Sequence, residues 1–260
     1  MSNRNGLKWN REETILAFEL YSRTPYGRIH YSNPDIISLS TALERTPGSV
    51  SRKMQNLASY DPELQARGVK GLPHSSKLDG LIFEEFSKDL EELSFQAHLI
   101  KEKYGITDKE TLSILKDLDD MPSGKYKERL VKTRIGQHAF RSAVLSTYNN
   151  RCCITGLSLP EMLVASHIKP WKVSKEKDER TNPQNGLCLN AFHDKAFDLG
   201  LITIDKHYII KVSGKLKKAG MDDVTCGWIM SYANERINLP EKFKPGLEFI
   251  EYHNDVIFKP

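Results

Sequence analysis

Two histidines and one asparagine in the second half of the chain stand out for their chemistry and spacing. His167, Asn185 and His193 are separated by 18 and then 8 positions. An imidazole titrates near neutral pH, so it can take a proton from water or bind a metal ion. A carboxamide can hold a loop in place, because it both donates and accepts hydrogen bonds. The three side chains therefore have the chemistry of a metal-assisted site.

The stretch around these residues has the pattern of two short strands followed by a helix. Leu163–Ile168 is a short apolar run, which predicts a strand that carries His167 near its end. A charged, polar segment separates it from a second apolar run, Leu187–Leu189. Asn190 can cap a helix that carries the second histidine. Such a hairpin and helix can bring two imidazoles and the carboxamide around one metal ion.

Three segments in this order, SHIKPW, NPQNGLCL and FHDKAFD, resemble the HNH family of ββα-metal endonucleases. The pattern is most similar to a branch found in predicted bacterial restriction endonucleases. The resemblance extends over residues 134–258, roughly half of the chain. The ordered set of His, Asn-Gly, apolar run, His and Phe-Asp is far more specific than a single histidine, which would more often be structural.

The resemblance implies a role for each of the three residues. His167 would be the general base that takes a proton from the water attacking the scissile phosphate. Asn185 would hold the hairpin loop, and with it the base, in register. His193 would bind a divalent cation, Mg²⁺ or Mn²⁺, that stabilises charge on the transition state and the leaving oxygen.

The sequence departs from the family pattern directly before the base. Many HNH proteins have a metal-binding Asp there, whereas this chain has Ser166. The ion would then have one or two protein ligands and rely on water and phosphate, as Mg²⁺ often does. The candidate ligands are His193, Asp194, Ser166 and Asp198, although Asp198 could equally brace the turn at Leu199-Gly200.

Four cysteines bear on a second kind of metal site: Cys152, Cys153, Cys188 and Cys226. Two Cys-x-x-Cys pairs would indicate structural zinc, and some HNH proteins carry such pairs. Here the segments Cys153-Ile-Thr-Gly and Cys188-Leu-Asn-Ala each keep one cysteine of the two. We therefore expect no structural zinc and expect buried free thiols.

Residues 1–80 have the pattern of three helices. Asn10 can cap the first, Pro34 can open the second, and Thr46-Pro47 can begin the third. This order suggests a helix-turn-helix or winged-helix domain that reads DNA through its third helix. The alternative is a small helical domain with a solvated polar face. The residues expected to face outward from the third helix are Ser49, Ser51, Arg52, Lys53, Gln55 and Asn56.

The following segments have plainer patterns. Gly71–Lys77 is a candidate wing or binding loop, in which His74 should be exposed. Residues 81–124 have the pattern of a charged helical linker with an apolar packing stripe, which could join the domains or help form a dimer. That stripe consists of Ile82, Phe83, Phe86, Leu90, Leu93 and Leu99.

Residues 125–260 would form the nuclease domain, and they begin with a basic helical segment. Arg134, Gln137 and Arg141 are three or four positions apart, so they share a helix face. Together with Lys169 they are candidate phosphate contacts, although the same face could simply be solvated. Residues 201–204 and 208–212 predict two strands, residues 247–252 a short helix, and His207 and His253 are expected at the surface.

Composition limits the remaining possibilities. The chain has 260 residues, 39% hydrophobic and 28% charged, with a formal net charge of +4. This length favours two domains, and the mild positive charge is compatible with a polyanionic partner. No apolar run is long enough to span a membrane, and the first residues lack the pattern of a signal peptide, so we expect a cytoplasmic protein. We expect an α+β fold, with a helical winged-helix-like or helix-turn-helix-like domain followed by a ββα-metal HNH domain.

The resemblance to the HNH family implies a divalent-metal-dependent endonuclease that cuts double-stranded DNA, in a restriction-type defence system. Dependence on modified DNA stays open. We expect a homodimer, because duplex cleavage needs two cuts and the chain has one site, and we expect no small-molecule cofactor. The alternative is a DNA-binding regulator with a degenerate HNH fold, for which the missing Asp at Ser166 leaves room. An RNA-directed nuclease is less favoured, because no stacking-aromatic motif of an RNA-binding module is visible.

Overall fold

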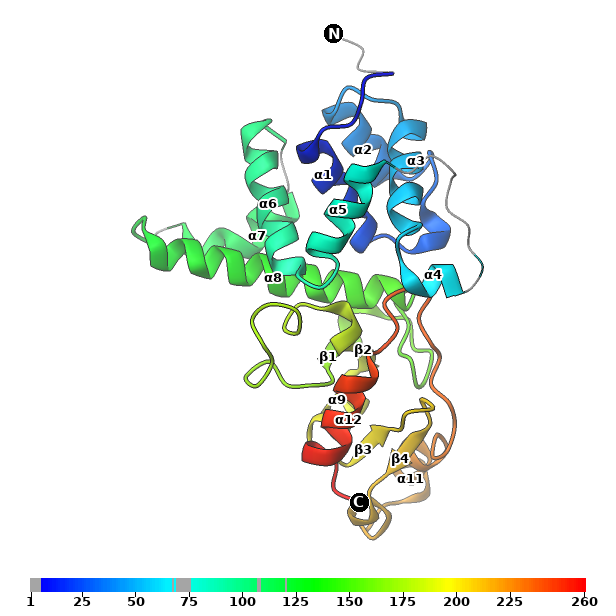
Figure 1. Cartoon of the computed structure of the whole chain (residues 1–260). Helices are drawn as coiled ribbons and strands as arrows, with labels where there is room; N and C mark the ends of the chain where they lie inside the picture. Colours follow the sequence, from blue (N-terminus) through cyan, green and yellow to red (C-terminus); the bar gives the residue numbers. More distant parts are fainter. Residues whose placement is uncertain (1–5, 67, 69–75, 107–108, 120) are drawn as a thin grey trace. The chain divides into compact units, whose positions relative to one another are not determined.

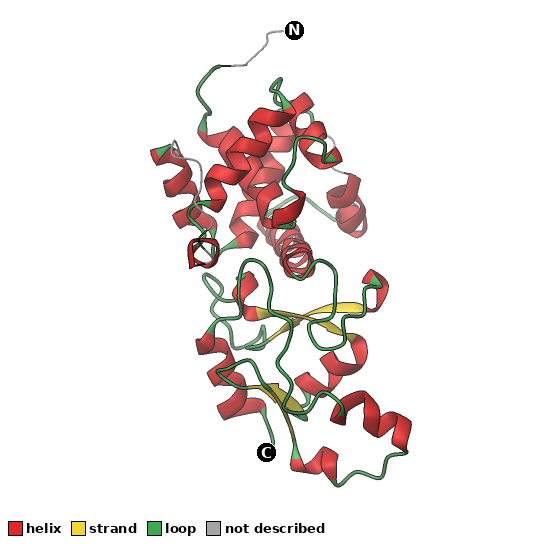
Figure 2. Ribbon diagram, turned by 90° about the vertical axis from the view of Figure 1, so that its right-hand side faces the viewer, coloured by secondary structure: helices red, strands yellow, loops and turns green. Residues whose placement is uncertain are grey.

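The chain folds into two units. The computed structural model describes residues 6–66, 68, 76–106, 109–119 and 121–260. Unit 1 comprises Met1–Ala143 and Lys177–Asn182, and unit 2 comprises Val144–Glu176 and Pro183–Pro260. The division falls inside helix α8 (Lys125–Thr147), whereas the sequence pattern places a boundary before residue 125. Both helices and small antiparallel sheets are present, in keeping with the expected α+β class (Figure 2).

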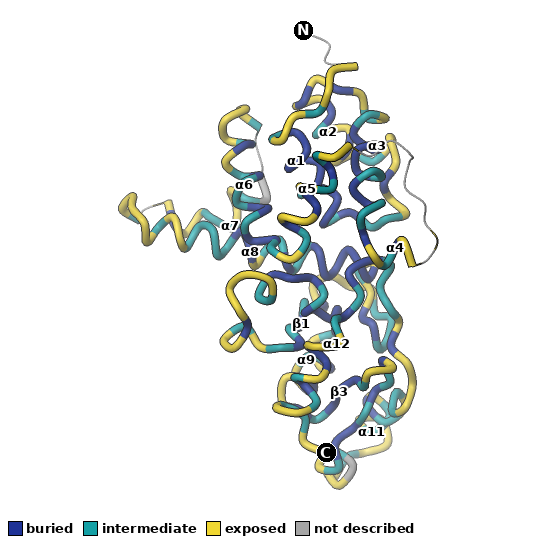
Figure 3. The backbone as a smooth tube through the Cα atoms, in the orientation of Figure 1, coloured by how far each residue is buried: buried dark blue, intermediate teal, exposed yellow. Residues whose placement is uncertain are grey.

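Helix α1 (Arg11–Ser22) is the element on which four other helices of unit 1 pack (Figure 1). Most of its residues are buried, as the tube coloured by burial makes clear (Figure 3). Its neighbours are α2 (Pro34–Ala42), α3 (Pro47–Ala58), α5 (Lys77–Phe86) and α6 (Leu90–Lys103). The shorter elements are η1 (Tyr26–Arg28), α4 (Pro62–Ala66), α7 (Lys109–Leu115) and η2 (Lys116–Leu118).

The predicted starts of the first three helices are confirmed. The Asn10 side chain accepts a hydrogen bond from the Glu13 N–H, and the Glu13 carboxylate accepts one from the Asn10 N–H in return. Pro34 and Pro47 each open a helix, where the missing proline N–H is not needed. The Thr46 side chain caps α3.

The winged-helix interpretation is not confirmed. The described part of unit 1 contains helices and no strand, and the predicted wing residues Gly71–Ser75, with His74, lie outside the described residues. Helices α5 and α6 contribute buried side chains to the core around α1, and both belong to unit 1. The predicted stripe is buried except at its end, because Leu99 is 43% exposed.

Unit 2 is built on two small sheets. Strands β1 (Leu163–His167) and β2 (Gly186–Asn190) pair antiparallel, and α9 (Ala191–Asp198) contacts both of them. Strands β3 (Ile202–Ile204) and β4 (Ile210–Val212) form the second antiparallel pair, as the sequence predicts. The other elements are η3 (Pro160–Met162), η4 (Pro183–Asn185), α10 (Gly214–Lys217), α11 (Asp223–Met230), α12 (Leu247–Tyr252) and the π-helical turn η5 (His253–Ile257).

The end of the chain closes onto the end of α9. Gly200 follows α9 with φ +67°, and its carbonyl accepts a hydrogen bond from the Lys259 N–H at 3.0 Å. A Cβ atom on Gly200 would lie 2.0 Å from the Ile257 carbonyl oxygen, so this approach requires glycine. Within the described residues, no helix is long and apolar enough to cross a membrane.

Candidate active site

His167 is the last residue of β1, and it pairs with Gly186 at the start of β2. The strand prediction for this histidine is therefore confirmed. Its side chain is half-buried, and its ring meets the Trp171 ring edge-on, with centroids 5.6 Å apart. This contact restricts the orientation of the imidazole at the end of the hairpin where the connecting loop begins.

Asn185 is fully buried and fastens the segment that follows His167. The Lys169 N–H donates to Asn185 Oδ1 at 2.8 Å, and Asn185 Nδ2 donates to the Lys169 carbonyl oxygen at 3.1 Å. The Ile168 N–H donates to the Asn185 carbonyl oxygen at 3.0 Å. The buried Ser174 hydroxyl also lies within 3.4 Å of Asn185 Nδ2. The Asn185 carboxamide thus holds Lys169, two residues after His167, by both its N–H and its carbonyl oxygen. The role of Asn185 in positioning the base stays a prediction.

His193 lies in the first turn of α9, which Asn190 caps. Its Nδ1 is 3.0 Å from Asn190 Oδ1, and its Nε2 is 3.0 Å from the Trp228 carbonyl oxygen. The side chain is buried, and this burial lowers the pKa of His193, while the hydrogen bond to Trp228 acts in the opposite direction. Both ring nitrogens therefore already have oxygen partners, and a metal ion would have to replace one of them.

The other candidate metal ligands are less well placed for a shared ion. Ser166 is buried, and its hydroxyl makes no hydrogen bond in the described structure. Asp194 and Asp198 are one turn apart on α9, and burial together with the charge of Asp194 raises the pKa of Asp198. The described residues contain no group of three or more His, Cys, Asp or Glu side chains that could hold a metal ion. The side chains thus do not fit an ion with three protein ligands, and the metal-binding roles stay predictions.

One comparison with known proteins bears directly on this hairpin. Residues 152–205 match the family described as HNH endonuclease. The match begins before β1, includes His167, Asn185 and His193, and ends just after β3. No curated protein matches the chain. The match supports nuclease function for unit 2 and DNA as its substrate, and nucleases of this family generally use a divalent metal.

Three of the four cysteines lie in the matched segment, and Cys226 lies on α11. Cys152, Cys153 and Cys188 are buried free thiols, and Cys226 is a half-buried one. The Cys153 N–H donates to the Cys188 carbonyl oxygen at 2.7 Å, which ties the start of the matched segment to β2. Burial, with Cys152 and Cys188 nearby, raises the pKa of the Cys153 thiol well above its ordinary value. These thiols have the character of packing residues in the core of unit 2.

The predicted nucleic-acid contacts of α3 need correction. Ser51 and Lys53 face inward rather than outward. The Ser51 hydroxyl donates to the Ile29 carbonyl oxygen at 3.3 Å, and the Lys53 ammonium forms a buried ion pair with Asp79 at 2.6 Å. The reason is that α3 contacts α1, α2 and α5, so more than one of its faces is covered. Among the remaining candidates Arg52 is exposed, and Ser49, Gln55 and Asn56 are half-buried.

The basic candidates outside α3 have mixed surroundings. Arg134 donates to the Ile114 carbonyl oxygen at 3.2 Å and pairs with Asp117 at 3.4 Å. Gln137 is exposed, and Arg141 is half-buried. Lys169 follows His167 by two residues, and its ammonium lies 5.3 Å from the centroid of the Tyr252 ring. Lys169 is therefore the predicted phosphate contact that lies beside the candidate base.

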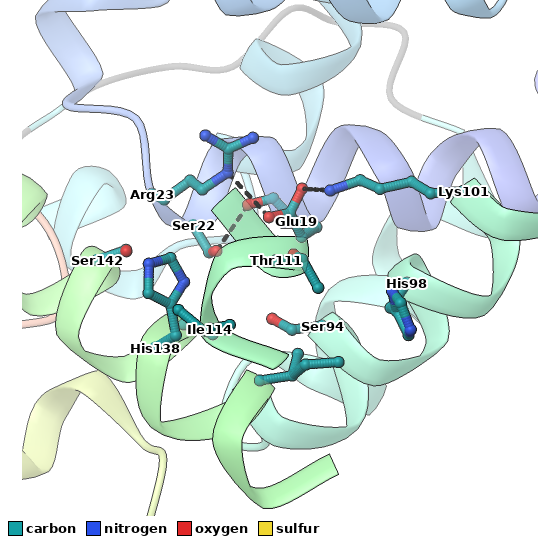
Figure 4. A pocket seen from close by; sticks show the side chains of 12 residues that line it. Glu19, Ser22, Arg23, Ser94, His98, Lys101, Thr111, Ile114, His138 and Ser142 are labelled. Atoms are coloured by element: carbon teal, nitrogen blue, oxygen red, sulfur yellow. Dashed lines mark hydrogen bonds and ion pairs between the residues drawn. The ribbon is translucent and has the colours of Figure 1, made fainter. Parts of the chain in front are cut away.

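A polar cavity lies inside unit 1, between α1, α6, α7 and α8 (Figure 4). Its volume is about 30 Å³, room for one or two water molecules. The Glu19 carboxylate bridges Arg23 at 2.9 Å and Lys101 at 3.4 Å, and the buried Ser94 hydroxyl has no hydrogen-bond partner in the described structure. This size suits water that satisfies Ser94 rather than a substrate.

One histidine was placed wrongly by sequence reasoning. His253 is buried, with Nδ1 2.8 Å from Thr203 Oγ1 and Nε2 3.1 Å from the Phe197 carbonyl oxygen. Its ring stacks on that of Phe197, with centroids 3.7 Å apart. Burial lowers the pKa of His253 to about 4. It braces the end of α9 from within, and its partners are too distant in sequence for any local pattern to reveal them.

Proposed function

We propose that this protein is a divalent-metal-dependent DNA endonuclease in which His167 is the general base. The observation that carries the proposal is the position of His167 inside the HNH match, directly before a loop that the buried Asn185 fastens. A catalytic base must be held within hydrogen-bond reach of the attacking water. A fixed loop lowers the entropic cost of reaching that geometry.

The proposed reaction is hydrolysis of a phosphodiester. A neutral His167 imidazole accepts one proton from a water molecule as its oxygen bonds to phosphorus. The bond from phosphorus to one ester oxygen breaks, and that oxygen leaves with the electron pair and takes up a proton. Lys169 lies near enough in the chain to place positive charge beside the phosphate, and His167 later returns its proton to solvent.

The divalent cation is part of the proposal because nucleases of the matched family generally use one. When bound, Mg²⁺ or Mn²⁺ would offset charge on the phosphate oxygens. One or two of the candidates His193, Asp194 and Ser166 would hold the ion, with water and phosphate completing the shell. For direct coordination, His193 would have to give up one of its two oxygen partners, either Asn190 Oδ1 or the Trp228 carbonyl oxygen.

Unit 1 is proposed to position the duplex. Arg52 on α3 and Gln137 on α8 are exposed polar residues that can reach DNA. A restriction-type defence role in the cytoplasm, acting on double-stranded DNA as a homodimer, is the setting that we propose. The proposal leaves open whether cleavage requires a base or backbone modification in the DNA.

A second candidate function is a DNA-binding regulator with a degenerate HNH fold. The observation that favours it is that each His193 ring nitrogen already lies 3.0 Å from an oxygen partner, so neither nitrogen is open to a metal ion. Such a protein would bind DNA without cutting it.

Incubation of supercoiled plasmid with the full chain separates the two functions. The nuclease account expects nicked or linear product with Mg²⁺ or Mn²⁺ and none with EDTA. Parallel digestion of unmodified and modified phage DNA tests the modification requirement. Retarded but intact DNA under every metal condition, on both kinds of DNA, would establish the regulator instead.

A further inference from the structure

Unit 2 contains an open cavity of about 420 Å³ beside the first turn of α9. Cavities that take small ligands usually have volumes of about 300–1,000 Å³. One wall is the start of α9, a second is α11 with the turn after it, and a third is the loop that precedes β1. All three walls belong to unit 2, so the cavity is complete within it.

The walls are rich in aromatic rings. Phe192 and Trp228 meet edge-to-face with ring centroids 5.5 Å apart, and Tyr232 meets the His193 ring in the same way at 5.7 Å. Trp228 is nevertheless 56% exposed and Phe192 38% exposed. A large, rigid aromatic surface that stays in contact with water is suited to stacking against a flat partner.

Hydrogen-bonding groups lie among these rings. Thr155 Oγ1 accepts a hydrogen bond from Asn190 Nδ2 and another from the Leu157 N–H, both at 3.3 Å. These two bonds use the lone pairs of the hydroxyl, so its proton can be donated to a ligand. The cavity thus combines flat apolar walls with a donor that could read the edge of a polar ring.

A cation lies on the loop that forms one wall. Arg151 is exposed, and its Nη1 donates to the Gly156 carbonyl oxygen at 3.5 Å. Gly156 lies between Thr155 and Leu157, both of which line the cavity. A guanidinium at this place can bind a phosphate through two parallel hydrogen bonds.

We propose that this cavity receives one unstacked nucleobase of the DNA substrate. The base stacks on Trp228, its edge accepts a hydrogen bond from Thr155, and Arg151 contacts an adjoining phosphate. The choice of ligand rests on the proposed nuclease function. Because every base has a flat face, the cavity selects an extruded or single-stranded nucleotide rather than a sequence.

An apolar side chain from a second protein copy would suit the cavity less well. It would cover Trp228 and Phe192 but would leave the Thr155 hydroxyl without an acceptor, which is unfavourable in a covered site. It would also have no use for the Arg151 cation. The two occupants make different demands on position 228, since a base needs an aromatic face whereas a side chain needs only apolar area.

The test measures binding without cleavage, in EDTA, with the full-length His167→Ala protein. Two fluorescein-labelled single strands of equal length serve as probes, an oligothymidine and a fully abasic strand with the same phosphates. Fluorescence anisotropy should give at least about fivefold tighter binding of the oligothymidine. Trp228→Leu should abolish this preference, Trp228→Phe should keep most of it, and Thr155→Val should reduce it. These changes leave the Trp228 carbonyl, and so its bond to His193, in place.

Equal affinity for the two strands, or no measurable binding of either, overturns the proposal. An unchanged preference in Trp228→Leu also overturns it, because apolar area alone would then suffice. Thermal melting of each variant checks folding, and Phe192→Leu replaces any position 228 variant that does not fold. Plasmid cleavage by the wild-type protein is scored separately, so loss of the base preference and loss of nuclease activity are distinguishable.

Discussion

Asn185 and Lys169, 16 positions apart, are joined by two hydrogen bonds between a buried carboxamide and one residue's backbone. The distances are 2.8 Å to Asn185 Oδ1 and 3.1 Å from Asn185 Nδ2. This relationship fixes the segment after His167 without using the imidazole itself. Asn185 can therefore position the base without being part of it, and the two roles can be tested by separate substitutions.

We expect Asn185→Asp to lower both stability and cleavage. A carboxylate cannot donate to the Lys169 carbonyl oxygen and would be buried, so the free energy of unfolding should fall by about 1–3 kcal/mol. Cleavage by the folded protein should fall by about tenfold or more, because the loop carrying the base loses its orientation. Urea unfolding and single-turnover cleavage measure the two effects.

Asn254→Ala is the matched control for this change. Asn254 Nδ2 donates to the Ile204 carbonyl oxygen at 3.0 Å, and its Oδ1 accepts from Thr203 at 2.9 Å. We expect a comparable loss of stability with cleavage retained at temperatures where both proteins are folded. Equal loss of cleavage in the two variants would argue against a specific positioning role for Asn185.

Substitutions of the adjacent residues Arg52 and Lys53 on α3 should affect different properties, DNA binding for Arg52 and stability for Lys53. Lys53→Met leaves the Asp79 carboxylate buried without its partner, and the free energy of unfolding should fall by about 3–5 kcal/mol. Arg52→Met changes an exposed residue, so stability should change by less than about 0.5 kcal/mol. Arg52→Met should instead weaken DNA binding and reduce its salt dependence. DNA affinity unaffected by Arg52→Met would remove α3 from the proposed DNA contacts.

Gly200 should be far less tolerant of alanine than Gly156. Both have positive φ, +67° and +74°, but only Gly200 would place a Cβ against backbone, 2.0 Å from the Ile257 oxygen. Gly156→Ala should cost about 1–2 kcal/mol from its backbone conformation alone. Gly200→Ala should cost at least about 3 kcal/mol, because the chain end must move away. Chemical denaturation gives both values, and similar costs would contradict the close approach of the chain end.

The lowered pKa of His253 should make the stability of the protein depend on pH. Its pKa in the folded protein is about 4, below the ordinary value of 6.5, so unfolding takes up a proton between these values. The stabilisation from the neutral, buried ring is complete above pH 6.5 and is lost as pH falls towards 4, by about 3 kcal/mol in total. Urea unfolding of wild type and His253→Phe across this range should give a shallower slope for the variant. Parallel slopes would mean that His253 is not buried in the neutral form.

Local patterns accounted for much of the fold. Asn10, Pro34 and Thr46-Pro47 begin helices as predicted, because capping depends on residues within one turn. The β1–β2 hairpin and the capping of α9 by Asn190 were predictable for the same reason. The bracing role of Asn185 came from the family resemblance, and its hydrogen bonds to Lys169 agree with it.

The remaining features depend on partners distant in the sequence. Lys53 is buried against Asp79, which is 26 positions away in the sequence on α5. His253 is buried against Thr203, which is 50 positions away. The partner of His193 Nε2 is a backbone carbonyl on α11, 35 positions away, which no side-chain motif indicates. Periodicity assigns a face to each residue but does not reveal how many neighbours cover that face.

The most direct test of the central claim compares His167→Ala with His207→Ala on supercoiled plasmid in Mg²⁺. His207 is an exposed histidine on the turn between β3 and β4, so it controls for loss of an imidazole from the same unit. If His167 is the base, its loss should slow cleavage at least about a hundredfold with DNA affinity unchanged, while His207→Ala should cut like wild type. Cleavage by His167→Ala at the wild-type rate would contradict the account.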